Sequence, residues 1–242
     1  MKKNFEELDY QKTRMGDLVL QRRRMLSLNG REVYEVKLGE DYLMSSLFHD
    51  AEEALAHIGL GALDGADWDV VVGGLGLGYT AAAVLAFKQV ARVVVVEALA
   101  PVIEWHRREL VPNGKGLSRD ARCVYHHADF FALARGDGFD PTVNGTRFDA
   151  ILLDIDHNPE FWLHGSHADL YSIKGLQRLK SFLKPHGIFA LWSNDPPEDA
   201  FLKLMSTVFA SAEGHRVDFD NPLQQTVATN GVYVACCSNR SK

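Results

Sequence analysis

The sequence is poor in several features that define large classes of protein. Only three of its 242 residues are cysteine, too few for an even disulfide framework, which favours a reducing compartment. Lysine and arginine total 26 against 32 acidic residues, and the net charge of −6 argues against a duplex nucleic-acid binder. The chain lacks the roughly 18 uninterrupted apolar residues of a membrane span, and its first residues lack the apolar core of a secretory signal. We therefore expect a cytoplasmic protein that binds small molecules, with neither nucleic acid nor membrane as a partner.

The first sixty residues have the pattern of a small antiparallel sheet. Asn29-Gly30 stands between two strand-like runs and supplies the positive φ angles of a type I′ turn. Gly39-Glu40-Asp41 marks a second turn, and a helix is expected over about residues 50–58. We predict an N-terminal β domain with a connecting helix over residues 1–62.

From Trp68 onward, continuous apolar runs alternate with segments of helical spacing. Runs such as "WDVVV" and "RVVVVE" are typical of strands buried on both faces, as in a parallel sheet covered by helices. The alternation predicts right-handed crossovers and a doubly wound α/β sheet. Near the end, "EGHRVDFDN" and "NGVYVACC" predict two strands that form an antiparallel edge. We assign residues 63–242 to one Rossmann-like, mostly parallel domain with an antiparallel C-terminal strand.

A glycine-rich turn follows the first strand of this domain and opens the next helix. In an open parallel sheet, ligands bind outside the carboxyl ends of the strands, and glycines let backbone amides approach them closely. The spacing departs from the G-x-G-x-x-G of dinucleotide binders, which counts against NAD. We expect the nucleoside of a ligand to lie on Gly73, Gly74, Gly76 and Gly78.

Acids at the ends of the next two strands complete a nucleoside pocket. Glu97 ends the second strand, where a carboxylate commonly binds ribose hydroxyls. Asp129 and Phe130 follow the third strand and are assigned to the adenine amino group and to an aromatic contact; the alternative for Asp129 is a helix cap. No phosphate site accompanies these residues. Together they predict a pocket for an adenosyl sulfonium compound of the S-adenosylmethionine type.

The segment "FDAILLDIDHNP" places further polar residues where the fourth strand leaves the sheet. If the chain stays extended there, Asp154 and Asp156 lie on one face and repel each other unless a cation lies between them. An amine substrate is such a cation, and its ammonium must lose a proton before nitrogen can attack a carbon next to sulfur. We assign Asp154 as the base and Asp156 as the anchor of the substrate charge, and we place His157, Asn158 and Tyr171 around the acceptor.

These segments resemble the polyamine aminopropyltransferases, the spermidine synthase family. The resemblance covers most of the chain, from the N-terminal hairpins through "VVVGGLGLG", "HHADFF" and "LLDIDHNP" to "GIFALWS". It implies a fold of the class I S-adenosylmethionine methyltransferase type, decarboxylated S-adenosylmethionine as co-substrate, a place in polyamine biosynthesis and a homodimer. By resemblance, the glycines line the donor, Glu97 binds ribose, Asp129 binds adenine and Asp154 is the catalytic aspartate.

The chain departs from the family pattern in the half that would recognise the propylamine. The family loop resembles GGGDGG, with an aspartate that meets the donor amine, but this chain has Gly76 and Leu77 there. Pro159 lies one place further from Asp154 than in the family pattern DSxDP, and Glu52 replaces the histidine of a pattern like YHEML.

Two other functions therefore stay open. A methyltransferase would use intact S-adenosylmethionine, whose carboxylate a loop aspartate would repel. A non-catalytic nucleoside-binding relative is the second alternative, although such a protein needs no base at Asp154. The segment Asn194–Glu198 resembles the [DN]PP[YF] motif of amino-group methyltransferases, but it follows the fifth strand, and we expect a helix capping box there. No helical pair of histidines with an acid is evident, and we expect no metal.

Overall fold

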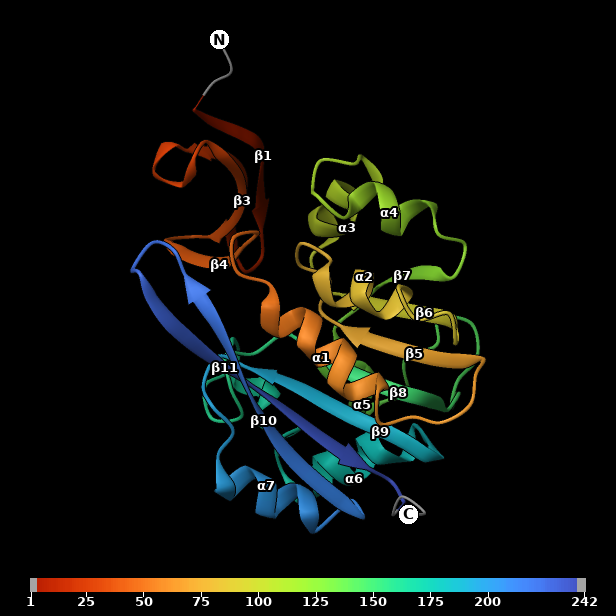
Figure 1. Cartoon of the computed structure of the whole chain (residues 1–242). Coiled ribbons are helices and arrows are strands. Elements are labelled where there is room, and N and C mark those ends of the chain that lie inside the picture. The colour runs from red at the N-terminus through yellow and green to blue at the C-terminus, as the bar shows by residue number, and fades with distance from the viewer. Residues whose placement is uncertain (1–3, 239–242) are drawn as a thin grey trace.

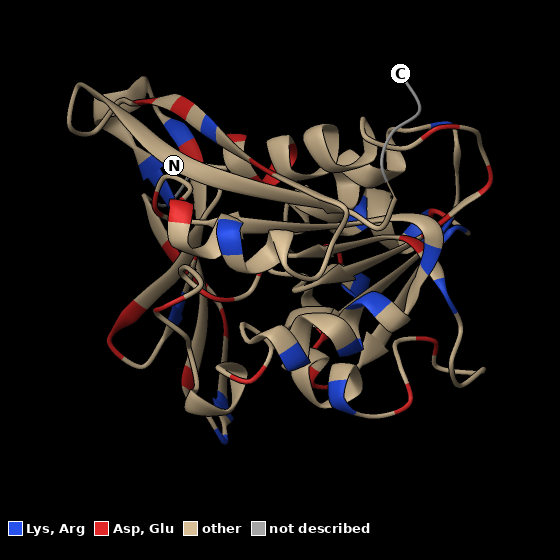
Figure 2. Ribbon diagram, turned by 90° about the horizontal axis from the view of Figure 1, so that it is seen from below, with Lys and Arg blue, Asp and Glu red and all other residues tan. Residues whose placement is uncertain are grey.

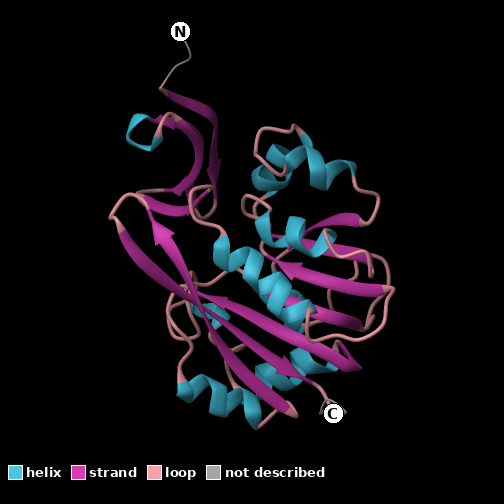
Figure 3. Cartoon of the chain, in the orientation of Figure 1, coloured by secondary structure: helices cyan, strands magenta, loops and turns pink. Residues whose placement is uncertain are grey.

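Residues 4–238 of the chain are described by a computed structural model, and they form two sheets (Figures 1 and 3). The smaller sheet is antiparallel throughout and has the strand order β1-β2-β3-β4. Leu18, Leu20, Val33 and Val36 on its two central strands are buried, whereas the two edge strands have no buried residue. Its strands are β1 (Phe5–Thr13), β2 (Gly16–Met25), β3 (Arg31–Leu38) and β4 (Asp41–Ser45).

The turns of the small sheet follow the glycines. Asn29 and Gly30 have φ angles of 55° and 77°, as the sequence predicts. The pairing of the strands nevertheless ends at Met25 and Arg31, because residues 26–28 form one 3-10 turn before the Asn-Gly pair. The connection is therefore longer than a two-residue hairpin turn.

The larger sheet has the order β10-β11-β9-β8-β5-β6-β7. Its five strands from β9 to β7 are parallel, while β11 runs antiparallel to β9 and pairs antiparallel with the edge strand β10. This confirms the predicted doubly wound α/β sheet with an antiparallel C-terminal strand. The strands are β5 (Trp68–Gly73), β6 (Val90–Glu97), β7 (Cys123–His127), β8 (Phe148–Leu153), β9 (Leu183–Ser193), β10 (Ser211–Asn221) and β11 (Thr226–Cys236).

Helices cover both faces of the large sheet. Successive residues of a strand point to opposite faces, so Val70 and Val72 enter one core and Val71 the other. The first core contains residues of α1 (Asp50–Leu60), α2 (Tyr79–Leu85), α3 (Ala100–Arg107) and α4 (Gly114–Arg119). The second contains residues of α5 (Phe130–Arg135), α6 (Ile173–Ser181) and α7 (Asp199–Ser206).

The connecting helix α1 packs on the large sheet, against β8, β9 and β11, and beside α2 (Figure 1). Its Leu55 and Leu60 are fully buried in the first core. The division of the chain between residues 62 and 63 stays a proposal. None of the helices within residues 4–238 is both long and apolar enough to cross a membrane.

The strand order reverses between β5 and β8, since the chain adds strands outward from β5 to β7 and then returns to place β8 on the other side of β5. Ligands of doubly wound sheets bind at this switch point, outside the carboxyl ends of the strands. The carboxyl ends of β5 and β8 carry Gly73 and Asp154. Basic and acidic positions are interspersed over both sheets (Figure 2).

Candidate active site

The glycine turn and the segment after β8 touch each other directly. The Asp154 N–H donates to the Gly73 carbonyl at 2.8 Å. Gly74 has a φ of +94°, and a Cβ there would lie 2.1 Å from the Asp154 carbonyl oxygen. Only glycine fits this approach, which explains the residue type. Gly76 and Gly78 also have positive φ, and the side chain of Met44 on β4 covers Gly76.

Glu97 ends β6 beside the same turn. Its carboxylate accepts hydrogen bonds from the N–H groups of Leu75 at 3.0 Å and Leu99 at 2.8 Å. Burial raises the pKa of Glu97, while these backbone donors lower it. The residue thus fastens the turn to the end of the neighbouring strand. Its predicted contact with a ribose stays a proposal.

The two residues assigned to adenine lie in different surroundings. Asp129 is exposed, and its Oδ1 accepts from the N–H groups of Phe131 at 2.8 Å and Ala132 at 3.2 Å, which is the helix-cap alternative. Phe130 is only 2% exposed and stacks on Phe139 in the core, where it lies under Gly73. The ring supports the turn from below and does not line the surface, contrary to its expected place beside the base.

Asp154 is half-buried at the end of β8. Its Oδ2 accepts a hydrogen bond of 2.7 Å from the Thr80 hydroxyl on α2. Burial raises the pKa of Asp154 to about 6, although the bond from Thr80 lowers it. Within residues 4–238, no hydrogen bond to its Oδ1 is formed, so this oxygen remains able to accept a proton.

A second carboxylate lies near Asp154 from a distant part of the sequence. The Thr80 hydroxyl is 3.3 Å from the main-chain carbonyl of Glu52 on α1. Burial, and next the negative charge of Asp154, raise the pKa of Glu52 to about 8. From the sequence, Glu52 stands out only as a departure from the family pattern. The spacing of neighbouring residues does not predict a contact between α1 and the end of β8.

Asp156 does not share a face with Asp154, and this expectation is wrong. β8 ends at Leu153, so the chain is no longer extended and strand alternation ceases. The Asp156 side chain is fully buried and accepts hydrogen bonds from Leu163 N at 2.9 Å, His167 Nδ1 at 2.8 Å and the Tyr171 hydroxyl at 2.8 Å. Since three protein donors occupy it, Asp156 is not an open anchor for a substrate ammonium.

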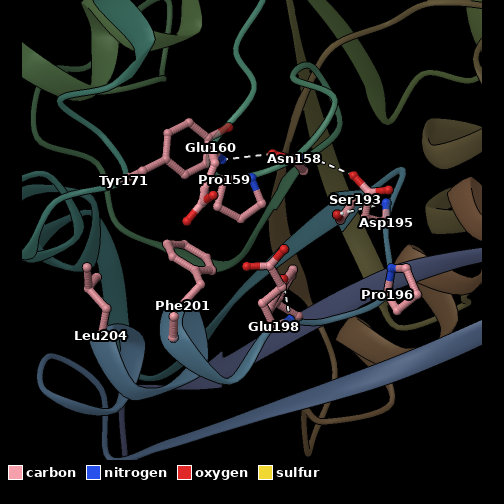
Figure 4. Close-up of a pocket in the computed structure, with 12 residues that line it drawn as sticks. Asn158, Pro159, Glu160, Tyr171, Ser193, Asp195, Pro196, Glu198, Phe201 and Leu204 are labelled. Atoms are coloured by element: carbon pink, nitrogen blue, oxygen red, sulfur yellow. Dashed lines mark hydrogen bonds between the residues drawn. The ribbon is translucent and has the colours of Figure 1, made fainter.

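A cleft opens beside this segment, at the carboxyl ends of β8 and β9; its space of about 540 Å³ includes a part that is open to solvent (Figure 4). Buried Tyr171, Phe201 and Tyr233 form its walls. Asn158 lines it and donates from Nδ2 to Asp195 at 2.6 Å, while the neighbouring His157 stacks on Phe161.

Three exposed carboxylates surround the cleft. The side chains of Glu160 and Glu198 point toward one another, and Asp195 lies at the other end (Figure 4). Burial raises the pKa of Tyr233, and the charges of Glu198, Asp195 and Glu160 raise it further, which places all three near its hydroxyl. Sequence reasoning missed this group.

The segment that carries Asp195 and Glu198 is not a capping box. α7 begins at Asp199, and no side chain caps it. The Asp195 carboxylate instead binds Asn158, and the Glu198 N–H donates to the Tyr233 hydroxyl at 2.8 Å. Within the described part of the chain, no group of three or more histidine, cysteine or acidic side chains is arranged to hold a metal ion.

The chain is similar in sequence and in fold to known proteins. A family model described as the spermine/spermidine synthase domain matches residues 49–230. The fold is similar to that of a spermidine synthase in complex with the transition-state analogue AdoDATO, with a TM-score of 0.73 and 18% identity over 96% of this chain and 74% of that one. A spermidine synthase from Thermotoga maritima gives a TM-score of 0.71 at 18% identity, over 96% and 73% of the two chains. No curated protein matches this chain significantly.

Proposed function

Since this chain belongs to the spermine/spermidine synthase family, we propose that it transfers an aminopropyl group from decarboxylated S-adenosylmethionine to an amine. The family consists of transferases, and the chain is an enzyme of that class. One observation carries the finer proposal: Asp154, with its pKa raised and one oxygen unbonded within residues 4–238, lies directly against the glycine turn at the switch point.

The donor's nucleoside would lie over the glycine turn. In this proposal, the backbone of residues 73–78 faces the donor, Glu97 reaches the ribose, and the Asp129 carboxylate meets the adenine amino group. The solved relative with AdoDATO supports a donor of this type, because that compound is named as a transition-state analogue bound to a similar fold. Phe130 contributes by packing beneath Gly73.

The chemistry requires a base and no acid. The amine nitrogen attacks the propyl carbon bonded to S⁺, the carbon–sulfur bond breaks, and its electron pair stays on sulfur as a neutral thioether. The attacking ammonium, with a pKa near 10.4 by analogy with lysine, first gives a proton to the Asp154 carboxylate. A carboxyl with a pKa of about 6 is mostly ionised at neutral pH and is a better base than an ordinary aspartate.

The cleft beside Asn158 fits the rest of an acceptor amine. An alkyl chain would pack on Tyr171, Phe201 and Tyr233, and a second ammonium group would meet the carboxylates at the rim. We therefore assign acceptor binding to this cleft, with Asn158 and Tyr171 among its lining residues and His157 next to it. In this proposal Asp156 does not bind the acceptor itself; it accepts a hydrogen bond from the Tyr171 hydroxyl and so holds Tyr171 in the wall of the cleft.

A transfer assay tests the proposal. The protein is incubated with decarboxylated S-adenosylmethionine and a panel of diamines and polyamines, and products are identified by mass spectrometry. We expect methylthioadenosine together with an amine that is one aminopropyl unit heavier. Intact S-adenosylmethionine is the matched second donor, because the turn itself, residues 73–78, has no carboxylate to repel it. Methylated amines from that donor, with no aminopropyl product from the other, would make the enzyme a methyltransferase.

Two further proposals accompany this function. A homodimer is expected from the resemblance to the family, and sedimentation of the purified chain measures it directly. A role in polyamine biosynthesis follows from the proposed reaction. A cytoplasmic location is expected from the sequence, and fractionation of cells that produce the protein checks the compartment.

A further inference from the structure

Glu52 is a carboxylate at the proposed active site to which the reaction above gives no task. It stands in the first turn of α1, where its carboxyl accepts a hydrogen bond from its own backbone N–H and its main-chain carbonyl lies 3.3 Å from the Thr80 hydroxyl. The same hydroxyl binds Asp154 Oδ2 at 2.7 Å. One threonine side chain thus contacts both residues. Its hydroxyl has a single proton, and the shorter distance indicates that it donates this proton to Asp154.

The surroundings do not neutralise a second negative charge at this point. The charged groups that raise the pKa of the Glu52 carboxyl are Asp154, Asp50 and Glu53, all acidic, while only its backbone hydrogen bond lowers that pKa; Tyr79 from α2 is also near. The Glu53 Oε1 atom lies 2.8 Å from His49 Nδ1, so this carboxylate contacts the histidine ring. Within residues 4–238, no lysine or arginine forms an ion pair with Glu52 or Asp154. When two half-buried carboxylates lie near each other without a cation, ionisation of one raises the pKa of the other and favours the state in which one of them keeps its proton.

We propose that Glu52 is the second carboxylate of a pair with Asp154, and that this pair releases one proton when it takes up a primary ammonium group of a substrate. The inference rests on the proposed function and deepens it. An ammonium group has three N–H donors and one positive charge, so it can donate a hydrogen bond to each of the two carboxylates. A single proton binds to only one of them and leaves the other negatively charged. The proton of the empty pair passes to solvent, and the ammonium takes its place.

Where the donor supplies this ammonium, the pair also gives the site a preference among donors. Decarboxylated S-adenosylmethionine ends in a bare ammonium, whereas the intact compound has a carboxylate on the adjacent carbon. Two carboxylates attract the first and repel the second. The turn at residues 73–78 has no acid, so discrimination would come from α1 rather than from the glycine turn.

Calorimetric titration at pH 7 in two buffers of different ionisation enthalpy tests the proposal, because it counts the protons released on binding. The probes are decarboxylated S-adenosylmethionine, methylthioadenosine, which has no ammonium, and 1,4-diaminobutane added to the methylthioadenosine complex. We expect about one proton released when the ammonium-bearing donor or the diamine binds, and none with methylthioadenosine alone. The probe that releases the proton shows whether the donor or the acceptor supplies the ammonium.

Glu52→Gln should abolish the proton release and weaken binding of that probe by roughly tenfold to hundredfold, as expected for a lost charge-assisted hydrogen bond. Methylthioadenosine should bind as before. Glu53→Gln removes an equal charge one residue along α1, from a side chain directed at His49, and should retain the proton release.

Binding and transfer by the wild-type protein without any proton release would overturn the pair and leave the proposed function standing. The same result follows if Glu52→Gln releases as many protons as the wild type. Absence of both donor binding and transfer would overturn the proposed function, and the pair with it. The number of protons that the wild-type protein releases on binding tests the proposed pair even if the variant does not fold.

Discussion

Replacement of Glu52 by glutamine should change the stability of the ligand-free protein in a pH-dependent way. The pKa of Glu52 is about 8 in the folded chain against an ordinary value of 4.5. An acid whose pKa is raised by folding contributes full stability below its unfolded pKa and loses it as pH rises through the folded pKa. For these two values, the free energy of unfolding of the wild type falls by about 1 kcal/mol by pH 5 and by about 5 kcal/mol by pH 9, relative to its value at low pH.

Glutamine resembles the protonated acid and does not ionise, so the variant escapes this loss. We therefore expect the unfolding free energy of Glu52→Gln, relative to wild type, to rise by about 4 kcal/mol between pH 5 and pH 9. Denaturant unfolding at several pH values measures the difference, and Glu53→Gln serves as the control for removal of a charge from α1. A difference that stays constant with pH, or that falls, would refute the assignment of a raised pKa to Glu52.

Three other variants test separate parts of the site. Asp154→Asn should lower transfer by about 10²- to 10⁴-fold, the usual contribution of a general base, and leave methylthioadenosine affinity within a few-fold; equal loss of both would mean that the base is misplaced. Gly74→Ala should abolish donor binding and lower the melting temperature, because its Cβ would meet the Asp154 carbonyl at 2.1 Å; an unchanged protein would contradict the described turn. Tyr171→Phe should lower the unfolding free energy by about 1–3 kcal/mol, because Asp156 loses a buried donor; a neutral effect would show that the hydroxyl is not bound there.

The parts of the fold predicted from the sequence are those encoded by local pattern. Runs of valine such as "RVVVVE" have no polar face, so they require a strand covered on both sides, and β6 is one. The glycines of the turn are needed because their φ angles are positive and neighbouring atoms lie close, and both conditions leave a direct trace in the sequence.

The errors arose where a side chain's direction depends on distant contacts. Asp156 follows the strand by three residues, and its direction is decided by His167 and Tyr171, which no rule of alternation includes. Its position next to Asp129 predicts a ligand contact for Phe130, but the ring lies at the start of a helix that packs on the sheet and is buried in the core. The sequence alone could not reveal that Glu52 lies near Asp154, because α1 reaches β8 only through packing on α2 and the sheet.

Transfer requires that the glycine turn and Asp154 form a single site. A crystal structure of the protein with methylthioadenosine and 1,4-diaminobutane tests it directly. We expect the nucleoside over residues 73–78 and an amine nitrogen within about 2.6–3.2 Å of an Asp154 oxygen. A nucleoside bound elsewhere, or an amine held far from Asp154 while transfer proceeds, would contradict the claim.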